Sequence, residues 1–257
     1  MHGLPDDDRH TPVNRQVVLI ACLVAACDKP AGAAALAETP SGRPLRWPER
    51  EIVLTPMAEA RAGTPPTQLG RALTSAAKRW NRALAQCGAP RLLVNQEVAS
   101  EPQVRDDRIN AVLLHERRWC PPGTVQHEDC HPTDLSGRTH LYPRLAANTP
   151  EDGEIAGVDL EINGVGKPWA GNSPSPEAEL QLEAVLLHEL GHVLGLDHPC
   201  GPNLAWSRAG KELKPCDTPD MQDQVMHPSW AATIRASNMA PSKAEVAAIC
   251  AVYSRRP

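Results

Sequence analysis

Residues 188–198 read HELGHVLGLDH, and this stretch decides how the chain of 257 residues folds around a site. It ends an apolar segment that predicts a helix beginning near Ser175, with Ser175 as its N-cap and Pro176 in its first turn. His188 and His192 are four residues apart, so a helix projects both imidazoles from one face, where a single metal ion can bridge them. The pattern therefore predicts a metal site built on a helix.

The residues around this pair indicate a catalytic site rather than a structural one. Glu189 is turned by about 100° around the helix axis from the first histidine, which places its carboxylate beside the metal's open position as a general base. Gly195 allows the chain to leave the helix in a left-handed conformation, and the chain then returns His198 as the third ligand. Three histidines with one open position are typical of catalytic zinc. Single histidines often have no such role, but five fixed residues at this spacing recur by chance in about one of ten thousand such chains.

The spacing H-E-x-x-H-x-x-G-x-x-H resembles the signature of the metzincin zinc peptidases. The segment QVMHP, residues 224–228, resembles the Met-turn of the matrixins, a metzincin group, which implies that Met226 forms an apolar floor beneath the three imidazoles. The order of the expected elements over about residues 45–257 also resembles a matrixin catalytic domain. This resemblance implies an α+β, zincin-type fold with a mixed twisted sheet, an active-site helix, a long backing helix and a C-terminal helix. It further implies that the strand around residues 157–162 borders the cleft, where an extended peptide adds as another strand.

Three features depart from the family pattern. Astacin-like and serralysin-like relatives carry a tyrosine just after the methionine, whereas the tyrosines of this chain are Tyr142 and Tyr253. The segment CGAP, residues 87–90, resembles the metal-binding cysteine of matrixin propeptides, but it falls inside the expected catalytic domain, so no propeptide switch is expected. The loop around residues 127–131, together with His140, faintly resembles the second, structural zinc site of vertebrate-type matrixins. The favoured interpretation is instead a polar loop without metal, closed by a disulfide between Cys120 and Cys130.

The remaining elements follow from hydrophobic periodicity. Short apolar runs predict strands, and a longer run with a helical period predicts a helix that Gly88 and Pro90 end. Apolar and polar residues alternate over 158–163, which indicates a strand with one solvent-exposed face. The expected elements are strands at 51–55, 91–94, 109–114 and 155–162, a helix over 69–84, a polar loop over 119–150 and a closing helix from about 240.

The N-terminus indicates export. Arg9 and Arg15 precede the apolar run 17–26, which is too short to span a membrane but suits the hydrophobic region of a signal peptide. The run ends in LVAAC, residues 23–27, which resembles a bacterial lipobox and predicts lipidation of Cys27. An ordinary cleaved signal peptide and a buried strand are the alternatives. We therefore expect a signal peptide with a lipobox at 1–27, a flexible tether rich in Ala, Pro, Gly and Ser at 28–44, and the catalytic domain at 45–257.

The cysteines also fit an oxidising compartment. Apart from the two in the predicted signal region, six of the eight cysteines remain, and an even number in an exported chain suggests three disulfides. The favoured pairing closes two short loops and leaves one long-range bridge: Cys120–Cys130, Cys200–Cys216 and Cys87–Cys250.

Together these features predict a zinc endopeptidase that hydrolyses peptide bonds in extracytoplasmic proteins or peptides. One catalytic Zn²⁺ on the three histidines activates a water, and Glu189 accepts its proton. The expected form is a monomer outside the cytosol, either on a lipid anchor at Cys27 of a bacterial cell envelope or secreted. The net charge of −5 leaves no basic excess for phosphates, so nucleic acid is not an expected partner. The alternative is a non-enzymatic surface lipoprotein with a zinc-stabilised binding domain, and the intact Glu189 argues against it.

Overall fold

A computed structural model describes residues 34–58, 66–95, 108–121, 130–171, 174–201, 216, 219–228 and 239–254. The predicted signal region with Cys27 lies outside the described residues, and so do residues 28–33 of the predicted tether and His127, Glu128 and Asp129 of the predicted polar loop. Within the described part of the chain, no helix has the length and apolar character needed to cross a membrane.

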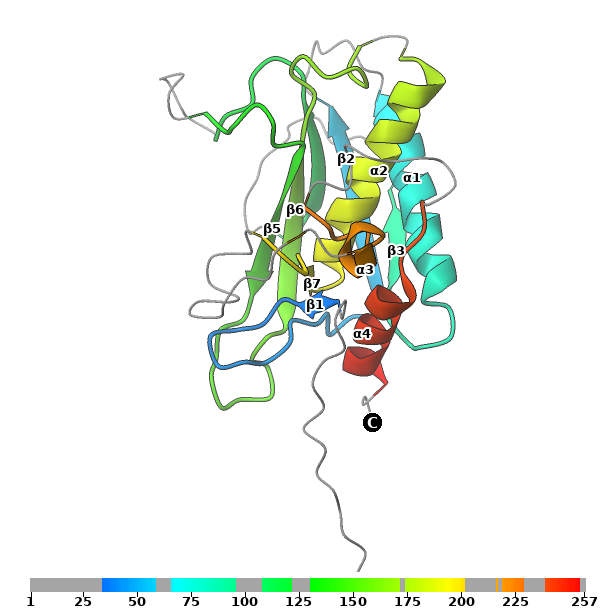
Figure 1. Cartoon of the computed structure of the whole chain (residues 1–257). Helices are drawn as coiled ribbons and strands as arrows, with labels where there is room; N and C mark the ends of the chain where they lie inside the picture. The colour runs from blue at the N-terminus through cyan, green and yellow to red at the C-terminus, as the bar shows by residue number, and fades with distance from the viewer. Residues whose placement is uncertain are drawn as a thin grey trace, which may run out of the picture. The chain divides into compact units, whose positions relative to one another are not determined.

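One mixed sheet of five strands forms the centre of the fold (Figure 1). The strands follow the order β3-β2-β4-β6-β5, in which the first four run parallel and β5 is antiparallel to β6. Their bounds are Glu51–Ala58 for β2, Arg91–Val94 for β3, Asn110–His115 for β4, Gly137–Pro143 for β5 and Ile155–Asn163 for β6. This mixed sheet agrees with the predicted α+β architecture.

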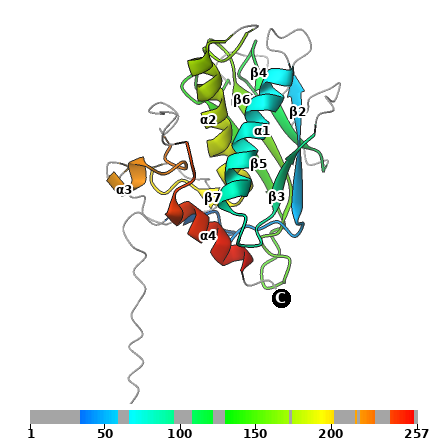
Figure 2. The same cartoon turned by 90° about the vertical axis from the view of Figure 1, so that its right-hand side faces the viewer.

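Two long helices, α1 (Pro66–Ala83) and α2 (Pro176–Val193), lie side by side on one face of this sheet (Figure 2). Trp80 of α1 is fully buried, and its indole N–H donates to the backbone oxygen of Leu187 in α2 over 2.8 Å. Because an unpaired indole N–H is costly in a core, this bond fixes how the two helices pack. The long backing helix and the active-site helix were both predicted.

The C-terminal helix α4 (Lys243–Tyr253) closes the domain below α2, and the short helix α3 (Pro219–Gln222) precedes it. Ser242 caps α4 and forms a capping box with Glu245. A disulfide between Cys87 and Cys250 ties α4 to the turn that follows α1. The other two disulfides join Cys120 to Cys130 and Cys200 to Cys216, so the predicted pairing of all six cysteines is confirmed.

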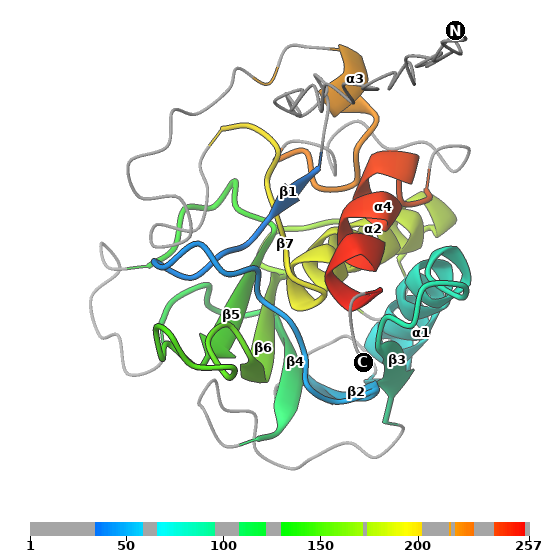
Figure 3. The same ribbon diagram turned by 90° about the horizontal axis from the view of Figure 1, so that it is seen from below.

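The prediction of a flexible tether up to residue 44 is wrong for residues 34–44. Strand β1 (Ala35–Leu36) pairs antiparallel with β7 (Leu196–Asp197), as seen from below in Figure 3. Ala34, Ala35 and Ala37 are all buried. Their abundance suggested a mobile linker, but small side chains also allow a backbone to pack closely against a neighbour, and this is what they do here.

The predicted cleft strand and the predicted long loop also need correction. Residues 119–150 contain β5, so they are not a loop throughout, and β5 rather than the strand around residues 157–162 is the last strand of the sheet. The residues of β6 lie between β4 and β5, and the face predicted to be solvent-exposed is buried, with Asp159 and Glu161 at most 1% exposed. Buried carboxylates are tolerated because neighbouring side chains bind them, as described below.

Candidate metal centre and active site

Helix α2 supplies His188, Glu189 and His192. Ser175 caps the helix by accepting a hydrogen bond from the backbone N–H of Ala178, and Pro176 occupies its first turn, as predicted. From Ala184 onward every residue of the helix is buried, so its last turns are core rather than surface. The two histidines and Glu189 are therefore polar groups in an apolar setting, where each needs a partner or a ligand.

The chain leaves α2 through Gly195, whose φ of +93° is in the left-handed region. A Cβ atom at this position would also come within 2.8 Å of the backbone oxygen of Leu45. Glycine is thus required both by backbone conformation and by the close approach of the N-terminal segment. The chain then continues through β7 to His198, whose backbone N–H donates to the carboxylate of Asp197 over 2.8 Å.

The three imidazoles meet at their Nε2 atoms. His198 Nε2 lies 3.0 Å from His188 Nε2 and 3.2 Å from His192 Nε2. The Nδ1 atoms of the two helical histidines are 2.7 Å from the oxygen of Val225 and 2.9 Å from that of Leu196, so each Nδ1 carries the hydrogen and donates it.

This arrangement fits a bound cation. With hydrogen on Nδ1, the Nε2 atoms of neutral His188 and His192 carry lone pairs, and His198 can donate at most one Nε2 hydrogen to the two of them. At least one of the two Nε2–Nε2 contacts of His198 then brings two lone pairs together, and they repel each other. A cation bound between the nitrogens would remove this repulsion. The donor set is the one that catalytic zinc prefers, and bonds from the other ring nitrogen orient such ligands.

Burial keeps these ligands neutral. It lowers the pKa of His188 to about 3, with a further contribution from the nearby His198, and it lowers the pKa of His192 well below the usual value for the same reasons. A neutral imidazole is the form that binds a metal. Both helical histidines are therefore ready to act as ligands at neutral pH.

Met226 packs against Gly191 of α2, the residue before His192. It is fully buried, and a Cβ atom at Gly191 of α2 would collide with its sulfur. The turn is held at both sides, since Val225 accepts the bond from His188 and the N–H of Met226 donates to the buried carboxylate of Glu245 over 2.7 Å. Helix α4 thereby supports the turn that contains Met226.

Glu189 points toward the sheet and is buried. Burial raises its pKa to about 7, although a hydrogen bond from Thr139 of β5 partly offsets this. A Cβ atom at Gly137 would lie 2.6 Å from Glu189 Oε1, so the carboxylate and the strand are in close contact. Sequence reasoning placed Glu189 beside the metal position but missed both β5 residues, because the strand itself was not predicted.

Other cysteines and histidines form no comparable site within the described residues. Cys200, Cys216 and His227 bring their ligand atoms together, but the two sulfurs are bonded to each other. Cys87, which resembles a propeptide switch in its sequence, is bonded to Cys250.

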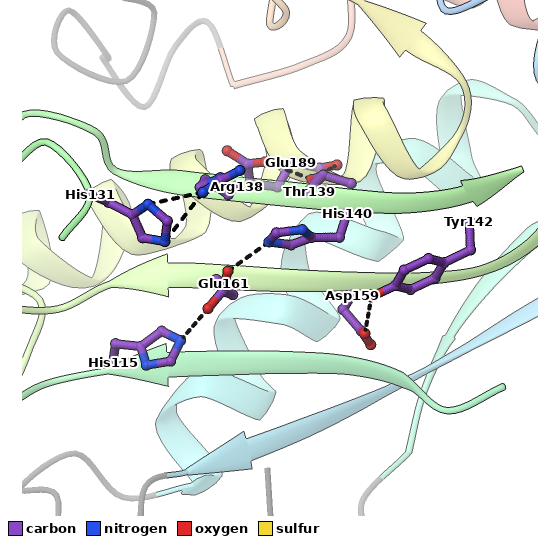
Figure 4. Close-up of polar contacts among 9 residues, drawn as sticks. All are labelled: His115, His131, Arg138, Thr139, His140, Tyr142, Asp159, Glu161 and Glu189. Atoms are coloured by element: carbon purple, nitrogen blue, oxygen red, sulfur yellow. Dashed lines mark hydrogen bonds and ion pairs between the residues drawn. The ribbon is translucent and has the colours of Figure 1, made fainter. Parts of the chain in front are cut away.

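The outer face of the sheet, opposite α1 and α2, carries a different polar cluster (Figure 4). Glu161 of β6 binds His115 of β4 through one oxygen at 3.0 Å and His140 of β5 through the other at 2.6 Å. His131, from the loop considered for a second zinc, contacts Arg138 at 2.9 Å. His131 and His140 are thus engaged with different partners, and neither belongs to a group of converging metal ligands among the described residues.

Comparisons with known proteins give partial matches. No family model matches the chain. A stretch of 121 residues is 31% identical to matrix metalloproteinase-25 of Mus musculus, and it covers 47% of this chain but only 17% of the mouse protein. Among solved structures, archaemetzincin from Methanopyrus kandleri aligns over 81% of this chain and 98% of its own length, with 14% identity and a TM-score of 0.35. A likeness of that size supports no conclusion about the site.

Proposed function

We propose that this chain is a zinc-dependent endopeptidase of the metzincin type, similar to the matrixins, that hydrolyses peptide bonds in proteins or peptides. The observation that carries the proposal is the convergence of three imidazole nitrogens, two of which come from the helix that also carries the buried Glu189. The partial match to a matrix metalloproteinase supports the same assignment.

His188, His192 and His198 would hold the ion. When bound, zinc supplies Lewis acidity, which activates water for attack and polarises a carbonyl oxygen. Glu189 accepts a proton from the attacking water as the new C–O bond forms, and it gives a proton to the amine nitrogen as the C–N bond breaks. Glu189 is buried and bonded to Thr139 of β5, so its carboxylate is held in place beside the first histidine for this proton transfer.

Strand β5 is the edge on which we place an extended substrate. It ends the sheet order, and within the described part of the chain its one strand partner is β6. Gly137 and Thr139 of this strand contact Glu189, so a peptide that adds along the other side of β5 runs close to the base. Backbone hydrogen bonds of this kind bind peptides with little dependence on sequence, which suits an endopeptidase.

The decisive experiment compares the purified protein with a Glu189→Gln variant on a generic protein substrate. We expect about one zinc per chain in both, cleavage that a chelator abolishes and zinc restores, and a rate at least about 100-fold lower in the variant. Glu183→Gln, the same change on the same helix but against Arg79, is the matched control and should keep full activity. Bound zinc with equal cleavage in wild type and Glu189→Gln would refute the peptidase and favour a binding protein.

We also propose that the protein works outside the cytosol on a lipid anchor at Cys27. Three disulfides support the compartment, because such bonds persist where the environment is oxidising. Metabolic labelling with a radioactive fatty acid should mark the wild type and not Cys27→Ala. Equal labelling of both would disprove the anchor without affecting the peptidase assignment.

A further inference from the structure

The carboxylate of Glu189 lies in a notch on strand β5. A Cβ atom at Gly137 would come within 2.6 Å of Glu189 Oε1 and 2.9 Å of its Cδ, so the notch exists because residue 137 has no side chain. Two residues further on, the hydroxyl of Thr139 donates to Glu189 Oε2 over 2.6 Å (Figure 4). One oxygen of Glu189 therefore occupies the space left by the missing side chain of Gly137, and the other accepts a hydrogen bond from Thr139.

The pleat of the strand explains why these two residues act together. Residues 137 and 139 are two apart, so they share the face of β5 that looks toward α2. Thr139 pairs in register with Leu160, which belongs to the apolar core under the helices. His140, the residue after Thr139, pairs with Asp159 and points to the outer face, where it binds Glu161.

Packing alone does not explain why position 139 holds a threonine. Valine has nearly the same shape as threonine and suits a strand against an apolar core at least as well. The hydroxyl has one hydrogen, and its distances of 2.6 Å to Oε2 and 3.4 Å to the backbone oxygen of Glu189 assign that hydrogen to the carboxylate. The bond is short, as expected when the acceptor is charged.

We propose that Thr139 is a positioning residue for the general base, and that its hydroxyl holds the Glu189 carboxylate in one rotamer so that the base meets the attacking water in one orientation. Gly137 supplies the space that this rotamer needs. The inference rests on the proposed function, since the orientation of Glu189 affects a rate only if Glu189 is the base. Fixed orientation of a catalytic group is a substantial part of its effect on rate.

The test uses the zinc-loaded protein and three variants. Thr139→Val removes the hydroxyl and keeps the shape, whereas Thr139→Ser keeps the hydroxyl. Thr74→Val is the matched control, because the hydroxyl of Thr74 bonds to the backbone of α1 and not to the site. For each variant, zinc content, thermal unfolding, kcat and KM are measured, and the crystal structure shows where the Glu189 side chain lies.

We expect kcat of Thr139→Val to fall on the order of 10- to 100-fold, a part of what a general base contributes, with KM within about twofold of wild type and one zinc retained. Thr139→Ser should stay within about threefold of the wild-type kcat, and Thr74→Val should match wild type. In crystals of Thr139→Val, the Glu189 side chain should leave its notch or occupy more than one rotamer.

Three outcomes would overturn the role of Thr139. The first is a wild-type kcat for Thr139→Val. The second is an equal loss in Thr139→Ser and Thr139→Val, and the third is an unmoved Glu189 side chain in a slow Thr139→Val variant. Either of the last two would assign the effect to packing. Failure of the peptidase function itself is recognised separately, because wild type and Glu189→Gln would then cleave equally, whatever residue stands at position 139.

Discussion

Replacing Glu161 with glutamine tests how strongly three strands depend on one buried carboxylate. Glu161 is 1% exposed on β6, and the histidines that bind its two oxygens come from the strands on either side, β4 and β5. Burial alone would raise its pKa, but the hydrogen bonds from His115 and His140 outweigh burial and lower the pKa from 4.5 to about 2. The carboxylate is thus more stable as an anion in the folded protein than in the unfolded chain.

The magnitude follows from this shift. At about 1.4 kcal/mol per pKa unit, a fall from 4.5 to about 2 corresponds to about 3 kcal/mol of folding free energy. Because the folded-state pKa is the lower one, this stabilisation is fully present above the unfolded-state value and is lost as the pH falls from about 4.5 toward 2. Glutamine cannot take part in this titration. The difference in stability between wild type and Glu161→Gln should therefore shrink by about 2 kcal/mol between pH 5 and pH 3.

The assay is urea unfolding followed by tryptophan fluorescence at a series of pH values, with disulfides intact. A chelator is present throughout, so that acid release of metal does not contribute to the change. His140→Ala provides a second check, since loss of one donor should raise the pKa of Glu161 and move the acid-sensitive range to higher pH. A wild-type-to-variant difference that stays constant from pH 5 to pH 3 would refute the reasoning.

Four further predictions concern the site and its helix. Gly191→Ala should cost about 1–3 kcal/mol in chemical unfolding, because the new methyl group collides with the buried Met226 sulfur; no loss would show that the turn moves freely. Gly195→Ala should cost a similar amount, about 1–3 kcal/mol, and lower zinc content, since it combines a positive φ with a clash against Leu45. Ser175→Ala should destabilise the protein by about 1 kcal/mol without changing kcat. Zinc added to stripped protein at a hundred times its Kd should stabilise it by about 2.7 kcal/mol, as measured by thermal unfolding, and no shift would argue against a native metal site.

The sequence was most informative where chemistry depends on local spacing. The positions of His188, Glu189 and His192 relative to one another follow from the helical period, and the cap at Ser175 follows from its side chain and the proline after it. The cysteine pairing was also accessible, because two short loops left a single long-range pair. These features need no knowledge of the tertiary fold.

The edge strand was missed because its pattern has a tertiary cause. In β5 the alternating residues are Arg138, His140 and Tyr142 on one face, where an isolated sequence suggests a polar loop. Two of them bind carboxylates of β6: His140 binds Glu161, and Tyr142 donates to Asp159 over 2.9 Å. These polar residues of β5 therefore cover the buried carboxylates of β6, and this pairing cannot be read from either strand alone. The contact of Thr139 with Glu189 was out of reach for the same reason.

The third histidine shows why the segment before residue 45 belongs to the site. The rings of the two helical histidines are fixed by backbone carbonyls, so the geometry of the site depends on the path that brings His198 back. That path is held by residues 34–47: the N–H of Ala37 donates to the oxygen of Gly195 over 2.9 Å, and the indole of Trp47 donates to Val193 over 2.6 Å. A domain that began at residue 45 would keep the signature but lose β1, the strand that pairs with β7 immediately before His198. The metal site is therefore a property of the assembled domain, and residues 34–44 are part of its support rather than a tether.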